Sequence, residues 1–297
     1  MAWPQPMLRL LRGVEVRELT IERPKTARPT AAGRGQSQAG ALSDIGGALS
    51  RRWLWGALGW MDVRRRYSGA AMSSLWITAN TVLLVLCLTA VLAEPLGSTP
   101  RQYAPYVAVG LVVWHFIQLS ISEAASVFVA AGETIRHVAM PLSVHVLRLV
   151  WRNVIVFAHN AAIVPVVLLV CGTDVTVSVL LLIPAFLLLV VQITAASLLL
   201  GLLGARFRDV AQVVTSAMQL LFFATPIFWF PETLGPDRQW IVAANPLFAF
   251  IDIVRAPLVG AQAAEPSWAV ASAVTTVTTA VALWAFVRCR ERVAYWV

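Results

Sequence analysis

The chain has 297 residues, of which 59% are hydrophobic and only 13% are charged. Soluble domains average about a quarter charged residues, so this balance argues against a soluble protein and indicates one that crosses a membrane several times. The formal net charge of +8 does not indicate a nucleic-acid partner, because about half of the 23 basic residues precede Tyr67 and flank the first apolar segment.

The first 67 residues fall into two parts. Residues 1–44 are polar, rich in proline and without a helical period, which predicts a disordered cytoplasmic tail. Residues 45–67 have an apolar face with a spacing of three or four, formed by Leu49, Trp53, Ala57, Trp60 and Met61. This pattern predicts an amphipathic helix in the cytoplasmic interface. The helix is either a simple topogenic anchor or an element that moves during transport.

Six apolar segments follow, each long enough to cross a hydrocarbon layer of about 30 Å as a helix. They cover residues 72–93, 105–130, 149–171, 176–203, 211–230 and 267–288. With both termini in the cytoplasm, about 20 basic residues lie inside and only Arg101, Arg238 and Arg255 lie outside, in agreement with the positive-inside rule. We therefore predict an all-α membrane protein whose six transmembrane helices occupy residues 68–290, with a cytoplasmic tail at 291–297.

The connection after the second span is too long and too amphipathic for a simple turn. Its apolar residues are Ile135, Val138 and Met140, and its polar residues are Glu133, Arg136 and His137. The apolar set can seat a short helix against the membrane while the polar set faces the cytosol. Such a helix fits a groove on a soluble partner, and an interfacial linker is the open alternative.

The fifth span is interrupted at its outer end. It follows the charged turn Arg206-Phe207-Arg208-Asp209 and ends in an aromatic segment bounded by Pro226 and Pro231. Because proline has no backbone N–H group, the helix is expected to break near the outer membrane face. Broken helices at membrane depth usually line a path.

Two short apolar pieces follow the fifth span, at residues 240–244 and 247–258, separated by Asn245-Pro246. Each is too short to cross the membrane, so we predict re-entrant half-helices packed against protein or water. Asp252 and Arg255 are spaced for an ion pair on one helix face. An outside loop that carries a surface helix is the alternative.

No catalytic or nucleotide-binding motif is found, and Cys87, Cys171 and Cys289 have no disulfide or metal-ligand spacing. We therefore expect neither an enzyme nor a metal site. The polar residues at membrane depth are His115, Gln118, Glu123, His159 and Asn160. They could form the proton relay of a secondary transporter. However, His115 and Glu123 lie about 80° apart on the helical wheel, which favours a solitary Glu that faces a watery cavity or bonds to a neighbouring helix.

Aromatic residues are abundant, and several of the 12 Trp lie near predicted span ends. An interfacial aromatic belt explains most of them, although aromatic faces also offer weak contacts to a sliding glycan. The candidates for a channel lining, together with Glu123, are Trp114, Phe116, Phe222, Phe223, Phe228 and Trp229.

The order of several motifs resembles the membrane subunit of ABC-2 type exporters, in the branch that exports O-antigen, teichoic acid or galactan. The motifs are Asp62-Val63-Arg64-Arg65-Arg66-Tyr67-Ser68, Gly110-Leu111-Val112-Val113-Trp114, Ile135-Arg136-His137-Val138-Ala139-Met140-Pro141, Phe207-Arg208-Asp209-Val210, Thr225-Pro226-Ile227 and Asn245-Pro246 followed by Arg255. Together they cover residues 45–290.

This resemblance implies a homodimer with two copies of a separate cytoplasmic ABC ATPase, which binds the ATP and Mg, so that this chain holds no cofactor. In the family, the helix that matches 49–66 is a cytoplasmic gate and the one that matches 133–142 docks on the ATPase. The docking residues would be Glu133, Thr134, Ile135, Arg136, His137, Met140 and Pro141. The extracytoplasmic gate would contain Pro226, Asn245, Pro246, Asp252 and Arg255.

The substrate implied by the resemblance is a polyprenyl-diphosphate-linked polysaccharide or polyol phosphate that crosses the bacterial plasma membrane. Its diphosphate would be drawn to cytoplasmic arginines by charge-assisted hydrogen bonds. The candidates are Arg64, Arg65, Arg66, Arg206 and Arg208, next to Asp209. The alternatives are an ABC-2 drug or lipid exporter, a proton-coupled secondary transporter and a multi-span membrane enzyme such as a glycosyltransferase.

Overall fold

The computed structural model describes residues 32–68, 73–138, 140–174, 176–260, 263 and 265–297. The chain forms two units, Met1–Gln36 and Ser37–Val297, and the description below concerns the second unit. Its described residues form helices, turns and loops without a β-strand. The all-α fold predicted from composition is therefore confirmed.

Four helical stretches in the described residues are long and apolar enough to cross a membrane. They are α5 (Pro100–Ala124), α8 (Ser143–Ala161) with α9 (Ile163–Cys171), η2 (Val177–Leu181) with α10 (Leu182–Arg206), and α14 (Glu265–Trp296). Two apolar helices of shorter described length, α4 (Ser73–Leu92) and α11 (Val210–Ala224), lie where the first and fifth spans are predicted. An apolar helix thus lies at each of the predicted positions.

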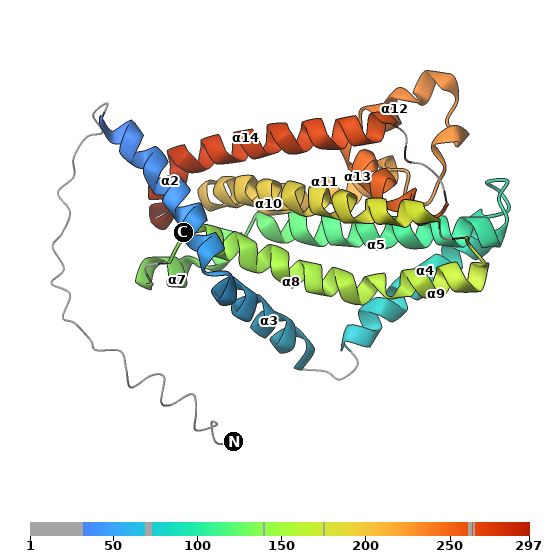
Figure 1. Ribbon diagram of the computed structural model, residues 1–297, viewed down its shortest axis with the longest axis horizontal. Helices are drawn as coiled ribbons and strands as arrows, with labels where there is room; N and C mark the ends of the chain where they lie inside the picture. Colours follow the sequence, from blue (N-terminus) through green and yellow to red (C-terminus); the bar gives the residue numbers. More distant parts are fainter. Residues whose placement is uncertain (1–31, 69–72, 139, 175, 261–262, 264) are drawn as a thin grey trace. The chain divides into compact units, whose positions relative to one another are not determined.

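Helix α5 occupies the centre of the bundle and contacts α4, α8, α9, α10 and α11 (Figure 1). In its most apolar stretch 67% of the residues are buried, whereas the other three long stretches bury only 22–28%. Those helices turn large apolar side chains outward, among them Leu169 and Ile183. An exposed apolar surface of this extent is stable in contact with lipid hydrocarbon.

Helix α10 also crosses α6 (Val127–Ala130), the single turn that follows α5. The crossing is close because Gly204 has no side chain: a Cβ at this position would lie 1.7 Å from the carbonyl oxygen of Ala125. Small residues at helix crossings allow this approach in membrane proteins. The glycine thereby fixes the end of α5 against α10.

The N-terminal segment differs from the prediction. Residues 1–31 lie outside the described residues, but residues 32–44, expected to be disordered, belong to the helix α2 (Ala32–Ser50). The expected single helix over 45–67 is instead the end of α2 and a second helix, α3 (Arg52–Ser68), separated at Arg51. Many glycines lower the helix propensity of α2, and tertiary packing compensates, since Ala41 and Ala48 are fully buried.

The C-terminal segment also differs from the prediction. Residues 291–297 were expected to form a tail, but α14 continues to Trp296 and fully buries Val293. Between α11 and α14 lie η3 (Pro231–Thr233), η4 (Pro236–Arg238), α12 (Trp240–Ala243) and α13 (Pro246–Arg255). Helix α13 packs against α5, α10 and α14, so the second short apolar piece is enclosed by protein.

Candidate functional site

One end of the bundle carries a short exposed helix, α7 (Gly132–His137), and is called the α7 end below (Figure 1). Glu133 lies 3.6 Å from Arg136 and 3.5 Å from His137, and all three side chains are mostly exposed. Ile135 packs inward against the core, whereas Val138 is 49% exposed. The inward Ile135 and outward charges agree with the predicted amphipathic helix, but the helix ends before Val138.

A carboxylate from α2 holds the segment that follows α7. The buried side chain of Asp44 accepts hydrogen bonds from the backbone N–H groups of Leu142 (3.0 Å) and Ser143 (3.1 Å) and from the Ser143 hydroxyl (2.7 Å). It also lies 3.6 Å from Arg290 of α14. The first N–H groups of a helix have no partner within it, and a negative charge there is favourable. Asp44 therefore caps α8 from another element, and we call these contacts the Asp44 clamp.

A second connection joins α7 to the end of α14. The Arg136 guanidinium donates through Nε to the backbone oxygen of Val297 at 2.9 Å, and its Nη2 also contacts this oxygen. The docking segment predicted over 133–142 is thus anchored to α2 at one side and to α14 at the other. The charged face of α7 remains open to solvent.

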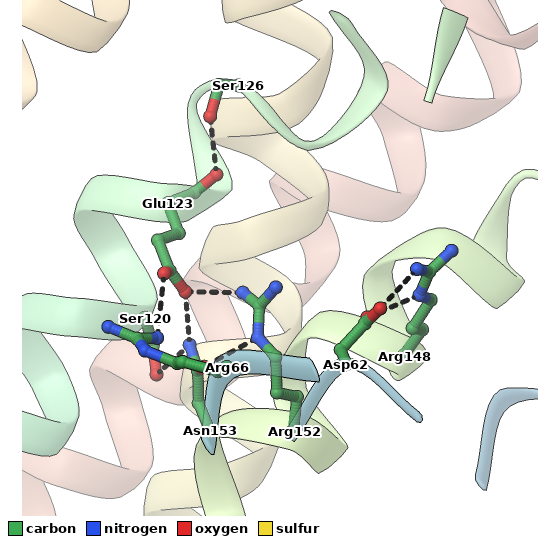
Figure 2. Close-up of polar contacts among 8 residues, drawn as sticks. All are labelled: Asp62, Arg66, Ser120, Glu123, Ser126, Arg148, Arg152 and Asn153. Carbon is green, nitrogen blue, oxygen red and sulfur yellow. Dashed lines mark hydrogen bonds and ion pairs between the residues drawn. The ribbon is translucent and has the colours of Figure 1, made fainter. Parts of the chain in front are cut away.

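Next to α7, polar side chains of three helices meet at Glu123, the last-turn acidic residue of α5 (Figure 2). Its carboxylate accepts hydrogen bonds from Arg152 (2.5 Å) and Asn153 (3.1 Å) of α8 and lies 3.5 Å from Arg66 of α3. Asn153 also donates to Ser120 at 3.3 Å. We call these five residues the Glu123 cluster. Glu123 is therefore bonded to neighbouring helices. The sequence favours such a bonded Glu over a proton relay.

A second ion pair lies beside this cluster. Asp62 of α3 accepts two hydrogen bonds from Arg148 of α8, at 2.6 and 2.5 Å (Figure 2). Both ion pairs, with Arg65, line a cavity of about 580 Å³ at the α7 end, which we call the charged vestibule. Arg65, Arg148 and Arg152 supply three positive charges to this lining against the carboxylates of Asp62 and Glu123, so the vestibule attracts anions.

Beyond the Glu123 cluster, a cavity of about 430 Å³ lies between α4, α5 and α8. We call it the polar chamber. Its polar side chains include Asn80, Thr81, His115, Gln118, Ser122, Asn153 and Asn160, and Arg66 lies at its edge. Of the polar residues singled out at membrane depth, His115, Gln118 and Asn160 are therefore brought together. His159 is exposed and does not line this chamber.

Most of the predicted aromatic lining gathers between α5 and α11. Phe222 lies with its ring centre 5.8 Å from Trp114, 5.3 Å from Phe223 and 5.3 Å from Phe228. The Trp114 indole N–H donates to Gln118 at 3.1 Å, which connects this cluster to the polar chamber. Phe116 is separate from it, because its ring packs on Phe157 and Phe186 in the core.

At the opposite end of the bundle, which carries α12, the helix α11 stops at Ala224 and leaves backbone carbonyl groups without helical partners. Tyr103 donates to the Phe228 oxygen at 2.5 Å, and Tyr106 donates to the Trp229 oxygen at 3.0 Å. Free carbonyl groups are costly in a membrane, so these hydroxyls stabilise the break that Pro226 and Pro231 predicted. Trp229 itself donates to the Phe223 oxygen at 3.2 Å.

Asp252 and Arg255 do not form the ion pair that their spacing allows. The buried Arg255 donates to the Pro226 oxygen at 2.9 Å and stacks 3.7 Å from the centre of the Tyr106 ring, while Asp252 accepts from Ser267 at 2.7 Å. The Arg255 guanidinium therefore binds the Pro226 carbonyl and the Tyr106 ring in preference to Asp252, three positions earlier on the same helix. Burial lowers the pKa of Arg255, and the nearby Tyr106 and Asp252 act in the opposite direction.

The remaining predicted gate residues bracket the same break. Asn245 caps α13 by accepting from the Leu247 N–H at 3.0 Å and donates to the Thr225 hydroxyl at 2.8 Å. Pro246 occupies the first turn of α13, where its missing N–H group costs nothing. Asn245 therefore ties the start of α13 to the end of α11.

The predicted arginine set is divided within the described chain. Arg64, Arg65 and Arg66 lie on α3, with Arg65 in the vestibule and Arg66 on Glu123. Arg206 instead lies over the rings of Phe207 and Trp296, next to the exposed Arg208 and Asp209. The predicted arginines are thus split into two groups at the α7 end, one on α3 and one in the α10–α11 turn.

Several residues of these sites were missed in the sequence: Asp44, Tyr103, Tyr106, Arg148, Arg152 and Asn153. Asp44 was assigned to a disordered tail, and the others lie near the ends of predicted spans, where polar and aromatic residues are ordinary. A signal did exist for Arg152-Asn153, a charged and polar pair within an otherwise apolar stretch. In the described part of the chain, no group of three or more His, Cys, Asp or Glu side chains could hold a metal ion.

Comparisons with known proteins identify the family of the chain. Residues 54–259 match the family described as ABC-2 type transporter. Two proteins of Klebsiella pneumoniae, each named O-antigen export system permease protein RfbA, are 25% identical over 191 residues, which is 64% of this chain and 74% of the relative. A Myxococcus xanthus protein of the same name is 25% identical over 193 residues, with the same two shares. The matched region includes the Glu123 cluster and the polar chamber.

Proposed function

The chain belongs to the ABC-2 type transporter family, and from this membership we propose that it is the permease subunit of an exporter of polyprenyl-diphosphate-linked polysaccharide or polyol phosphate. It is a multi-pass protein of the bacterial inner membrane. The observation that carries the proposal is the family match over residues 54–259, combined with relatives named as O-antigen export permeases.

We propose six membrane spans with both termini in the cytoplasm. The four long apolar helices support this count, and so do α4 and α11 at the two remaining predicted positions. In this topology the α7 end is cytoplasmic. Arg64–Arg66 and Arg206–Arg208 then lie on the cytoplasmic side, which agrees with the positive-inside rule.

The energy source in this proposal is a separate cytoplasmic ABC ATPase, present in two copies on a dimer of this chain. The exposed charged face of α7 supports it as the docking element, because the same helix is anchored from within by Ile135 and Arg136. ATP and Mg would bind to the partner ATPase. An anchored helix transmits force to α8 and α14, whereas a loose linker would not.

The substrate's diphosphate is proposed to meet the vestibule first. Arg65, Arg148 and Arg152 line this space and exceed its carboxylates, Asp62 and Glu123, in number. An anionic headgroup can compete with Glu123 and Asp62 for these guanidinium groups. The aromatic cluster around Phe222 and the break held by Arg255 would line and close the conduit further along.

One observation favours a second candidate, an ABC-2 exporter of a drug or simple lipid. A cavity of about 770 Å³ between α8 and α10 is lined almost entirely by apolar side chains, including Trp151, Phe157 and Phe186. Such a surface suits hydrocarbon rather than a diphosphate or a sugar. The two candidates therefore differ in whether the vestibule arginines are needed.

The test uses cells whose own copy of the gene is deleted and replaced by variants of this chain. Replacing both Arg65 and Arg152 with Gln is expected to reduce surface polymer at least about fivefold and to leave lipid-linked polymer on the cytoplasmic side. The matched control is the pair Arg51→Gln and Arg52→Gln, which lies outside the vestibule. Unchanged surface polymer in the first variant would favour the drug or lipid exporter.

Docking is tested separately on purified membranes. Changing Glu133 and His137 together to Ala removes two exposed charged groups of α7. It leaves in place the partly buried Ile135 and the contact of Arg136 with Val297, which anchor the helix. We expect loss of the co-purified ATPase, while Arg208→Ala retains it. If the ATPase co-purifies equally with both variants, α7 is not the docking element.

A further inference from the structure

The polar chamber lies between helices that are largely apolar, yet many of the side chains that line it are polar. Amide, imidazole and hydroxyl groups from α4, α5 and α8 line it, namely Asn80, His115, Gln118, Ser122, Asn153 and Asn160. Its volume of about 430 Å³ falls within the roughly 300–1,000 Å³ range of small-molecule sites. Asn153 and Asn160 have hydrogen bonds within the protein, but an apolar occupant would offer none to Asn80, His115 or Ser122.

Several of these polar groups have no partner among the residues that the structure describes. Within the described part of the chain, no hydrogen bond or ion pair reaches the side chains of Asn80, His115 or Ser122. Gln118 accepts one hydrogen bond from Trp114, and its NH₂ group remains available. Unsatisfied polar groups at membrane depth cost several kcal/mol each in hydrocarbon, so the chamber must hold water or a ligand that offers hydroxyl groups.

The depth of the chamber can be read along α5. His115 lies eight residues from Glu123, which corresponds to about 12 Å of helix. The chamber therefore extends from Arg66 and the Glu123 cluster toward the middle of the bundle. Because the cluster separates it from the charged vestibule, an occupant would pass Glu123 before it reaches His115.

The chemistry of the lining selects a neutral, hydroxyl-rich occupant. Arg66 is the one cationic side chain among the described residues of the lining, and it already faces Glu123, so an anion gains little by moving deeper into the chamber. Amide and imidazole groups both donate to and accept from hydroxyl groups. The partly exposed ring of Phe157 forms part of the wall and offers an apolar surface to the C–H side of a sugar ring.

We propose that the polar chamber binds individual sugar units of the exported polymer, with Asn80, His115, Gln118 and Ser122 as the hydrogen-bonding groups. This inference rests on the proposed function, because it takes the polymer to be a glycan. It adds a defined contact site within one protomer, distinct from the charged vestibule. Binding through hydroxyl groups common to most sugars lets successive units occupy the chamber in turn.

The first arm of the test measures whether water enters the chamber. Cys87, Cys171 and Cys289 are replaced by Ala, and a single cysteine is introduced by Ser122→Cys or, as a control, Leu83→Cys on the exposed surface of α4. A small charged thiol reagent is expected to label Ser122→Cys in nanodiscs at least about tenfold faster than Leu83→Cys, because only the thiolate in water reacts. Equal slow labelling at both positions would overturn the proposal.

The second arm measures sugar binding. Oligosaccharides released by mild acid from the cells' own surface polymer are added at millimolar concentration, with glycerol as the control solute. Labelling of Ser122→Cys should slow at least about threefold with the oligosaccharides and not with glycerol, whereas a Gln118→Leu background should abolish this protection. Labelling without protection means that the chamber holds water only, which overturns the sugar assignment.

The wild-type chain is examined in the same membranes for polymer export and ATPase co-purification. If both are present and the oligosaccharide does not protect Ser122→Cys, the chamber inference fails and the proposed function stands. If the oligosaccharide protects but the wild-type chain neither exports polymer nor retains an ATPase, the sugar site stands and the proposed function fails.

Discussion

Replacement of Asp44 by Ala tests whether a remote carboxylate fixes the segment between α7 and α8. Asp44 is 8% exposed and accepts three hydrogen bonds, two of them from the Leu142 and Ser143 N–H groups. Loss of a helix N-cap costs about 0.5–2 kcal/mol, and a hydrogen bond to a charged group contributes about 1.5–3 kcal/mol. We therefore expect local opening at the start of α8 to become easier by about 2 kcal/mol, or roughly 30-fold.

Hydrogen–deuterium exchange of the protein in nanodiscs measures this opening. The amides of Leu142 and Ser143 themselves donate to Asp44, so a peptide over residues 140–147 should exchange roughly 30-fold faster in Asp44→Ala. Asp44→Asn keeps an acceptor oxygen and should show a smaller increase. Ser43→Ala, at an exposed neighbouring position, is the matched control. An increase of less than about twofold in Asp44→Ala would show that α8 begins at this position without the clamp.

Three further changes test the other contacts. Gly204→Ala places a Cβ 1.7 Å from the Ala125 carbonyl oxygen, so it should destabilise the protein by about 3 kcal/mol or more in thermal unfolding. Gly46→Ala is the control and should leave the stability unchanged, because a Cβ there meets no atom within 4 Å. Equal unfolding temperatures of the two variants would contradict the close crossing of α10 and α6. Arg255→Leu leaves the Pro226 carbonyl unpaired and removes the stacking on Tyr106, so trypsin should cleave the α11–α14 connection faster, by a factor that corresponds to about 3 kcal/mol. Tyr106→Phe should cost only about 1 kcal/mol in the same assay. Unchanged cleavage of Arg255→Leu would refute the role of this contact. Glu123→Gln should lower the free energy of unfolding by about 1–2 kcal/mol after allowance for the partial exposure of the ion pair. Arg152→Met should lower it much less in the Glu123→Gln background than in the wild-type chain. Additive effects of the two substitutions would mean that the pair is not coupled.

The positions of the apolar helices could be predicted from the sequence because the pattern that indicates such a helix lies within the helix itself. A run of apolar residues such as 182–203 needs only its own length and composition to indicate a membrane helix. The break after Ala224 was equally local, since Pro226 and Pro231 lack the donors that a helix requires. Helix α2 was missed because it lacks such a local signal: its glycines give no periodic pattern. Its stability comes instead from contacts such as those of Asp44 with residues about 100 positions away.

The partners of polar groups could not be predicted in this way. Spacing along one helix suggested a pair between Asp252 and Arg255, but the fold supplies Ser267 and the Pro226 carbonyl instead. Each of these partners comes from another element, and no periodicity records which elements meet. Glu123 was a partial success because a lone carboxylate at membrane depth must find a partner, although the sequence does not say which arginine provides it.

Helix α5 explains why the separate features of the site form one arrangement. It contributes Tyr103 to the broken end of α11, Trp114 to the aromatic cluster, His115 and Gln118 to the polar chamber, and Glu123 to the cluster beside the vestibule. Tyr103 and Glu123 are 20 residues apart, which places them about 30 Å apart along the helix, close to the thickness of the hydrocarbon layer. Since α5 is also the most buried of the four long apolar stretches in the described residues, it cannot shift without changing contacts at both ends of the bundle. A movement started at the α7 end through Glu123 would therefore alter the hydrogen bonds that hold the break near Phe228.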